Sequence, residues 1–195
     1  MFHIIPAFNV SNTANAAKLS PKQKTDLAFK NAIDPYTFAF AGIDAGISQA
    51  QDGFHDYGQG MEGYAKRFAA SYADSFDGNM LGGAVFPILL RQDPRYFPKG
   101  SGTFTRRLIH AVGSIVRCKG DNGRWQPNFS YLIGNLAAGG ISNAYYPASD
   151  RGVGLTFQRA MVVTAEGGIG AVLFEFWPDI SRKLNRKHQS SPNNH

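Results

Sequence analysis

The chain has 195 residues, of which 43% are hydrophobic and 17% are charged, and it carries a net charge of +6. This length is enough to bury a continuous core, and we expect one domain. The low charge excludes a chain that is disordered beyond its ends. Cys118 is the only cysteine, which excludes an intramolecular disulfide and a cysteine-based metal cage.

The chain holds 22 glycines, above the roughly 7% of average usage. Several lie inside apolar, helix-like segments, with Gly42 and Gly46 as one pair and Gly78 and Gly82 as another. Glycine inside a helix costs about 1 kcal/mol relative to alanine. Its repeated use therefore indicates that helix backbones approach each other closely.

Residues 1–19 are predicted to form an extended arm, since they lack charge before Lys18 and are rich in Asn, Ala, Ser and Thr. The apolar start carries no basic region, and Pro6 interrupts it before it reaches the length of a signal-peptide core. No signal peptide is recognised, so we expect either that the protein is not exported by that route or that the chain begins after its signal.

Two helix starts follow the arm. Ser20, Pro21 and Gln23 are typical of an N-cap, a first helical position and the return of a capping box, and this first helix is predicted to end near residue 33. Asp34 and Pro35 repeat the signal and start a second helix that runs to residue 50.

An amphipathic helix is predicted over residues 60–76, with aromatic side chains at spacings of four on its apolar side and Arg67 and Asp74 elsewhere. Residues 79–90 are again apolar. Within them, Pro87 is expected to kink or interrupt the helix, because proline removes a backbone donor and clashes with the preceding turn.

Residues 92–102 are too rich in proline and glycine for a helix and are predicted to form a structured loop. A helix is predicted over 105–118, with arginines outside its apolar side. A turn at 119–123 follows it, and the sequence leaves open a short strand or hairpin around that turn.

Helices at 130–145 and 154–177 complete the pattern. The last is the best membrane-spanning candidate, although its apolar stretch at 160–174 is shorter than the ~20 residues that cross a bilayer. It either lies in a membrane or is buried in the protein. We expect residues 20–184 to form one helical domain and residues 185–195 a flexible polar tail.

These elements predict an all-α, glycine-packed bundle of about six helices. The alternative is an outer-membrane β-barrel, which also favours glycine and aromatic residues. Strands of a barrel alternate polar and apolar residues, whereas apolar residues run together here, as at Leu89 and Leu90. The helix caps at Ser20 and Asp34 also have no place in a barrel.

Asp44, Arg159 and Glu166 lie inside apolar segments. A buried charge is costly unless it is paired, so a buried position requires partners such as Arg159 with Glu166 or Asp44. Arg159 and Glu166 lie two turns apart on one helix face and can form a buried polar seam. The simpler interpretation, which the sequence favours, is that each of the three faces solvent.

No catalytic residue, cofactor or metal site is predicted. The chain has no nucleophile elbow, no Walker loop and no histidines at metal-ligand spacing. Gly58, Gly60 and Gly63 match a dinucleotide-binding fingerprint, but no strand precedes them, so the match is attributed to chance. The sequence therefore favours a protein that is not an enzyme.

Basic residues gather around 91–107 and again after the last apolar segment, at Arg182, Lys183, Arg186 and Lys187. Neither cluster has the aromatic interleaving or the spacing of a nucleic-acid-binding module, so nucleic acid is not among the expected partners. The second cluster suits anionic lipid head groups.

Several phrases of the chain, as a set, resemble an uncharacterised family of bacterial envelope proteins seen chiefly in acidobacteria. The resemblance spans most of residues 19–184 and implies an exported protein, but no activity and no catalytic assignments. The phrases that carry it are Leu19-Ser20-Pro21-Lys22-Gln23-Lys24, Asp34-Pro35, Gly58-Gln59-Gly60-x-x-Gly63-Tyr64, Gln92-Asp93-Pro94-Arg95-Tyr96-Phe97, Ile141-Ser142-Asn143-Ala144-Tyr145-Tyr146-Pro147 and Glu175-Phe176-Trp177-Pro178-Asp179-Ile180.

Two of these phrases end helices with aromatic turns that can pack together. Arg95, Tyr96, Tyr145, Tyr146 and Asp150 can then frame a pocket for a small anionic or sugar-like ligand.

The leading expectation is a non-catalytic, membrane- or envelope-associated structural protein that lies in the membrane or periplasm. Its expected partners are a lipid membrane surface, other envelope proteins or further copies of the chain. The alternative is a soluble or periplasmic small-ligand-binding module or enzyme that uses the polar and aromatic pocket.

Overall fold

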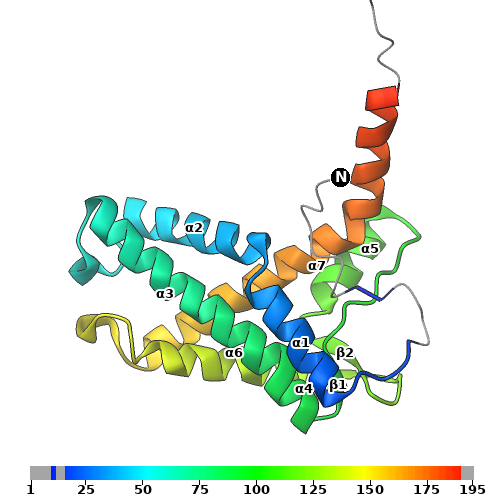
Figure 1. Ribbon diagram of the computed structural model, residues 1–195, viewed down its shortest axis with the longest axis horizontal. Helices are drawn as coiled ribbons and strands as arrows, with labels where there is room; N and C mark the ends of the chain where they lie inside the picture. Colours follow the sequence, from blue (N-terminus) through cyan, green and yellow to red (C-terminus); the bar gives the residue numbers. More distant parts are fainter. Residues whose placement is uncertain (1–9, 12–15, 190–195) are drawn as a thin grey trace, which may run out of the picture.

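The structure is a computed structural model that describes residues 10, 11 and 16–189, with side chains to residue 183. This part of the chain is predominantly helical, so the predicted all-α fold is confirmed (Figure 1). The strands form one small sheet in the order β1-β2-β3, which does not close, and the barrel alternative is wrong. The elements are α1 (Pro21–Ala32), α2 (Pro35–Ala50), η2 (His55–Tyr57), α3 (Gly60–Met80), η3 (Leu81–Val85), α4 (Phe86–Leu89), β1 (Gln92–Asp93), α5 (Phe104–Gly113), β2 (Arg117–Gly120), β3 (Trp125–Pro127), α6 (Phe129–Ser142), η4 (Ala148–Asp150) and α7 (Val153–Gln189).

The expected arm and tail fall largely outside the described residues, on 1–9, 12–15 and 190–195. Where the arm is described, Val10 forms a parallel bridge with Tyr96, and the Ser11 backbone N–H donates to the Tyr96 carbonyl at 2.9 Å. Helix α7 continues through Gln189, past the boundary expected at residue 184.

The first two helices begin where the sequence predicts. Ser20 and Gln23 exchange the two hydrogen bonds of a capping box at the start of α1. Asp34 caps α2 by accepting the Tyr36 backbone N–H at 2.8 Å. Both starts depend on neighbouring residues only, which is why the sequence suffices to locate them.

Pro87 was expected to kink or interrupt the helix, and the structure shows no break there. Helix α3 passes through the π-helical turn η3 into α4 without a break, and Pro87 lies in the first turn of α4. Pro87 has no backbone N–H to donate, but it follows the π-helical turn η3, where the α-helical hydrogen-bond pattern has already changed. Lys24 of α1 secures this junction by donating from Nζ to the Pro87 carbonyl at 3.0 Å.

The helix expected over 105–118 ends at Gly113, because the following residues form a hairpin. Strand β2 pairs antiparallel with β1 on one side and with β3 on the other, with Cys118 opposite Gln126. Gly123 supplies a positive φ of 75° in the connection. The hairpin that the sequence left open is therefore present.

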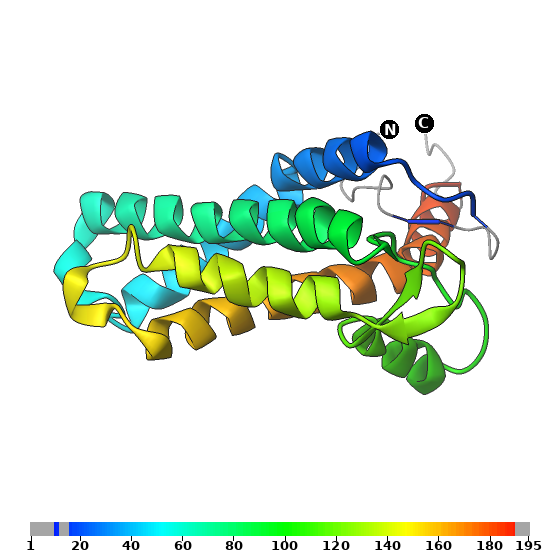
Figure 2. The same ribbon diagram turned by 90° about the horizontal axis from the view of Figure 1, so that it is seen from below.

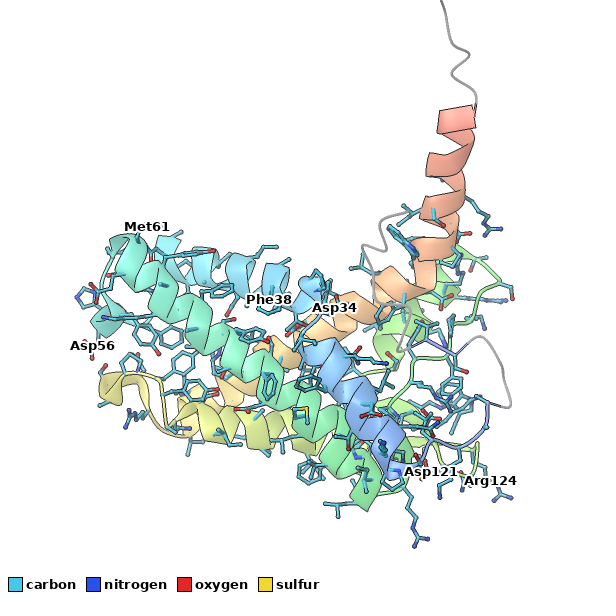
Figure 3. All side chains as sticks on the ribbon, in the orientation of Figure 1. Asp34, Phe38, Asp56, Met61, Asp121 and Arg124 are labelled. Carbon is cyan, nitrogen blue, oxygen red and sulfur yellow. The ribbon has the colours of Figure 1, made fainter. Side chains whose placement is uncertain are left out.

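Four helices, α2, α3, α6 and α7, form the bundle, and Figure 2 shows α3, α6 and the first part of α7 running along its length. Helix α5 and the sheet lie at one end, where α7 changes direction near Pro178 (Figure 1). Figure 3 places Asp56 and Met61 at the opposite end from Asp121 and Arg124.

The bundle interior is built from small and charged residues. A Cβ atom at Gly134 of α6 would lie 2.5 Å from the Cα of Gly82, so these two backbones approach too closely for any side chain. Most buried apolar residues are alanines, and buried charges include Arg67, Asp74 and Arg159. Many large apolar side chains are exposed instead, the reverse of the usual arrangement in a water-soluble domain.

Candidate functional site

A charge network centred on Arg159 of α7 lies between the four bundle helices. Its Nε donates to Asp74 Oδ2 of α3 at 2.6 Å, and its Nη2 donates to Asp44 Oδ2 of α2 at 2.8 Å. Asp74 is 0% exposed and Arg159 is 2% exposed, so this is an ion pair of the bundle interior.

Every acceptor position of Asp74 is used. Besides Arg159, Asp74 accepts from the hydroxyls of Ser142, Tyr145 (2.6 Å) and Tyr146 (2.7 Å). Because a buried carboxylate is costly until its hydrogen bonds are satisfied, the network holds its members in place. A saturated carboxylate has no lone pair left for a ligand, so this region joins helices rather than binding a substrate.

The structure corrects the interpretation in which Asp44, Arg159 and Glu166 each face solvent. Arg159 pairs with Asp44 as the sequence allowed, whereas Glu166 accepts from Ser75 Oγ at 2.7 Å and makes no ion pair with Arg159. Asp74, which the sequence placed away from the apolar side of its helix, is the missing partner.

The expected pocket of five residues does not form as one site. Tyr145 and Tyr146 are held by Asp74 at the end of the bundle where α6 and η4 meet, and Asp150 lies in η4. Arg95 and Tyr96 belong to the loop after β1, at the opposite end (Figure 1). The Tyr96 hydroxyl donates to Glu175, whereas the hydroxyls of Tyr145 and Tyr146 donate to Asp74. The two aromatic turns therefore do not pack together.

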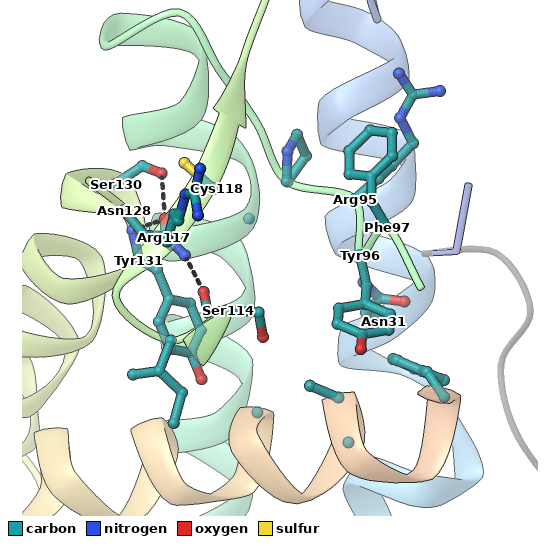
Figure 4. A pocket seen from close by; sticks show the side chains of 18 of the residues that line it. Asn31, Arg95, Tyr96, Phe97, Ser114, Arg117, Cys118, Asn128, Ser130 and Tyr131 are labelled. Carbon is teal, nitrogen blue, oxygen red and sulfur yellow. Dashed lines mark hydrogen bonds between the residues drawn. The ribbon is translucent and has the colours of Figure 1, made fainter. Parts of the chain in front are cut away.

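A cavity of about 750 Å³ lies at the sheet end of the bundle. In Figure 4, Tyr96 and Tyr131 lie on opposite sides of this space, with α7 along its floor. Asn128 joins the start of α6 to the end of α5 by donating to the Ser114 carbonyl at 2.9 Å. The cavity thus lies between elements that are far apart in the sequence.

Glu175 of α7 holds Tyr96, one of the residues that line the cavity. Its carboxylate accepts from the Tyr96 hydroxyl at 2.7 Å, from the Lys99 and Gly100 backbone N–H groups at 2.9 and 3.0 Å, and from Arg107 Nε at 2.8 Å. Burial, followed by this hydrogen bond, raises the pKa of Tyr96, so its hydroxyl stays a donor. The sequence predicted no role for Glu175.

Cys118 also lines the cavity. Burial raises the pKa of its thiol to about 12, with a smaller contribution from Asp93. The thiol is therefore protonated at neutral pH and is a poor nucleophile and metal ligand there. The described residues contain no group of three or more His, Cys, Asp or Glu side chains that can hold a metal ion.

The residues expected at a membrane surface lie on α7 after Pro178. Arg182 donates from Nε to the Pro178 carbonyl at 3.0 Å and pairs with Asp179, and Lys183 is exposed. Arg186 and Lys187 continue the same helix, in a part where only the backbone is described.

Comparison with known proteins adds no assignment to this geometry. No protein-family model, curated protein or solved structure matches the chain. The resemblance to an envelope family stays a prediction, and the function has to be argued from the residues themselves.

Proposed function

We propose that the protein is a non-catalytic helical protein of the cell envelope, embedded in the membrane through the outer surface of α2, α6 and the first part of α7. One observation carries the proposal. Along these helices up to Phe174, the only charged residues are Asp44, Arg159 and Glu166, and all three point into the bundle. The surface that these helices present outward has no charge at all.

That surface is instead covered by large apolar side chains. Monomeric water-soluble proteins rarely expose contiguous apolar patches of this kind, and larger ones mark membrane or protein contacts. The exposed members on the adjacent helices α6 and α7 are Phe129, Leu132, Ile133, Leu136, Ile141, Val153, Phe157, Met161 and Ile169.

Helix α7 is long and apolar enough to cross a membrane, and only 39% of its apolar window is buried by the rest of the protein. The part before Pro178 is about 37 Å long at ~1.5 Å per residue, which exceeds a hydrocarbon thickness of ~30 Å. A helix in the middle of a water-soluble core would be covered more completely.

The charge network is compatible with a lipid environment. Charged side chains within membranes face the bundle interior and pair with one another, as Asp44, Asp74 and Arg159 do here. The helices also meet through small residues, since Gly134 contacts Gly82 and Gly139 contacts the Thr156 backbone, which is the usual packing mode when lipid surrounds the helices.

The rest of the molecule supplies a water-facing side. Helices α1 and α3 carry exposed charges such as Lys22, Asp26 and Lys66. The direction change at Pro178 turns the basic end of α7 away from the bundle (Figure 1), where cationic side chains suit anionic head groups.

Fractionation of cells that express the full chain tests the proposal, with circular dichroism on the fraction that holds it. We expect helical protein in the membrane fraction that resists carbonate extraction. Recovery of the wild-type chain in the soluble fraction after carbonate treatment would refute membrane embedding.

A pair of matched substitutions distinguishes insertion into lipid from nonspecific adsorption to the membrane. Ile133→Lys adds a charge on the outer face of α6, and Thr25→Lys adds the same charge at an exposed position of α1. A lysine in hydrocarbon costs about 2.5–3.5 kcal/mol, so we expect only Ile133→Lys to lower the membrane fraction. Equal behaviour of both variants would mean that α6 does not face lipid.

The second candidate is a soluble or periplasmic small-ligand-binding module. The cavity of about 750 Å³ favours it, because ligand pockets commonly have this size. The polar and aromatic site expected from the sequence does not support it, since its members lie at two ends of the bundle. Fractionation distinguishes the two candidates.

A further inference from the structure

The cavity has a buried end with unmet hydrogen-bonding capacity. The Asn135 side chain is 1% exposed, and its Nδ2 donates to Thr164 Oγ1 at 3.0 Å, but its Oδ1 has no donor within the described structure. Asn31 of α1 lines the same cavity with a second buried amide oxygen that has none there. Buried acceptors are nearly always satisfied in proteins, so this end is suited to a hydrogen-bond donor.

Much of the cavity lining is apolar. Aromatic and aliphatic side chains supply contact area there and, apart from the Trp125 indole N–H, carry no hydrogen-bonding groups. The main members are Phe97, Ile109, Ile115, Val116, Trp125 and Phe174.

The exposed rim carries positive charge. Lys99, Arg106 and Arg117 line it and are exposed to solvent. Three acidic residues line the cavity, and each is already engaged: Asp93 pairs with Arg95 at 2.6 Å, Asp34 caps α2, and Glu166 accepts from Ser75 Oγ at 2.7 Å. The rim cations therefore have no acidic partner among the described residues, and they attract anions.

We propose that this cavity binds an organic anion with an apolar body, whose carboxylate or phosphate lies at the Lys99, Arg106 and Arg117 rim and whose far end carries a hydroxyl that donates to Asn135. A purely apolar tail would leave the Asn135 oxygen unpaired, and a sugar would leave the apolar walls in contact with polar groups. This inference goes beyond membrane embedding and does not depend on it.

Titration calorimetry on the full chain, held in phosphatidylcholine nanodiscs or in buffer as fractionation dictates, tests both ends of the ligand. The probes are 12-hydroxydodecanoate, dodecanoate, which lacks the hydroxyl, and 1,12-dodecanediol, which lacks the anion. We expect the hydroxy acid to bind most tightly and each of the others about tenfold more weakly. Comparison with 12-hydroxydodecyl phosphate shows whether the rim prefers carboxylate or phosphate.

Variants then assign the contacts. Replacing Lys99, Arg106 and Arg117 by glutamine should weaken binding of 12-hydroxydodecanoate about tenfold and leave 1,12-dodecanediol unchanged. Arg124→Gln is the control, because Arg124 is exposed in the hairpin that contains Arg117 but does not line the cavity.

Gly170→Leu tests the cavity itself. A Cβ at Gly170 would make only ordinary contacts, the nearest at 3.8 Å from the Tyr36 hydroxyl oxygen, so the variant should fold and fill part of the space. We expect it to abolish binding of all probes while the circular dichroism spectrum stays unchanged. Equal affinity of wild type and the rim variant for the hydroxy acid, equal affinity for all three probes, or no binding of any probe would overturn the proposal. None of these results bears on membrane embedding, which fractionation decides.

Discussion

Asp74 is the residue at which α3, α6 and α7 are joined, and removing its counter-ion should be costly. Arg159→Met leaves Asp74 buried without its counter-ion, and breaking a buried pair in this way costs about 3–5 kcal/mol. Lys66→Met is the control, because it breaks the exposed Lys66–Glu62 pair of α3, which is worth roughly 0–1 kcal/mol. Denaturant unfolding of both variants measures the difference, and equal losses would show that the network contributes no more than a surface pair.

A second residue-scale prediction concerns His55, in the connection between α2 and α3. Its Nδ1 lies 2.8 Å from Asp52 Oδ2, and this hydrogen bond raises the pKa of His55 above 6.5 and lowers the pKa of Asp52. The pair is therefore intact from above the Asp52 pKa up to the His55 pKa. Its contribution to stability is lost as the pH rises through the raised pKa of His55.

NMR titration of the His55 ring checks this value. Asp52→Asn should return the pKa of His55 toward 6.5, whereas Asp56→Asn, which removes only a weaker coulombic influence, should change it less. An unchanged pKa in Asp52→Asn would contradict the hydrogen bond.

The sequence predicted part of the buried network, and the difference is instructive. Asp44 and Arg159 stood out because each is a lone charge in an apolar segment. Asp74 did not stand out, because α3 also carries Glu62, Lys66 and Asp77 and looks like an ordinary amphipathic helix. Burial of Asp74 follows from its partners on other helices, and no local pattern encodes those partners.

At the scale of elements, the contact between α6 and η3 depends on glycine. A side chain at Gly134 would overlap the backbone at Gly82, whereas nothing lies within 4 Å of a Cβ at Gly140 of the same helix. Gly134→Val should therefore separate the helices at a cost of about 1–3 kcal/mol or more, and Gly140→Val should be nearly neutral. Thermal melting followed by circular dichroism compares them, and similar melting temperatures would show that the close approach contributes little.

Helix starts and helix ends differed in how well the sequence predicted them. The caps of α1 and α2 are local and were found. The end of α5 was not found, because the residues after it enter the sheet. Residues 117–119 pair with 125–127, and 119–120 pair with 92–93, which are distant in sequence. The buried side of α3 was also missed: small and polar residues such as Gly63, Ser71 and Gly78 face the core, while the aromatic side is only half-buried.

At the scale of the whole molecule, one side is charged and the other is not. Exposed charges lie on α1, α3 and α5, while the outer faces of α2, α6 and the first part of α7 have none. Composition averages the two sides, so the mean hydropathy of −0.25 conceals the asymmetry. The cavity likewise could not be predicted, because its walls come from segments between residues 27 and 174 that only the tertiary fold brings together.

This sidedness predicts opposite environments for two labels on one molecule. Ile133→Cys on α6 and Lys66→Cys on α3 are made in a Cys118→Ser background, and each is labelled with the same environment-sensitive fluorophore in phosphatidylcholine vesicles. Both positions are exposed, so labelling should leave the core intact. We expect lipid-attached bromine to quench the label at residue 133 and aqueous iodide to quench the label at residue 66, because only the first lies in hydrocarbon. Quenching of both labels by iodide would place α6 in water, and its apolar face would then require a protein partner in place of lipid.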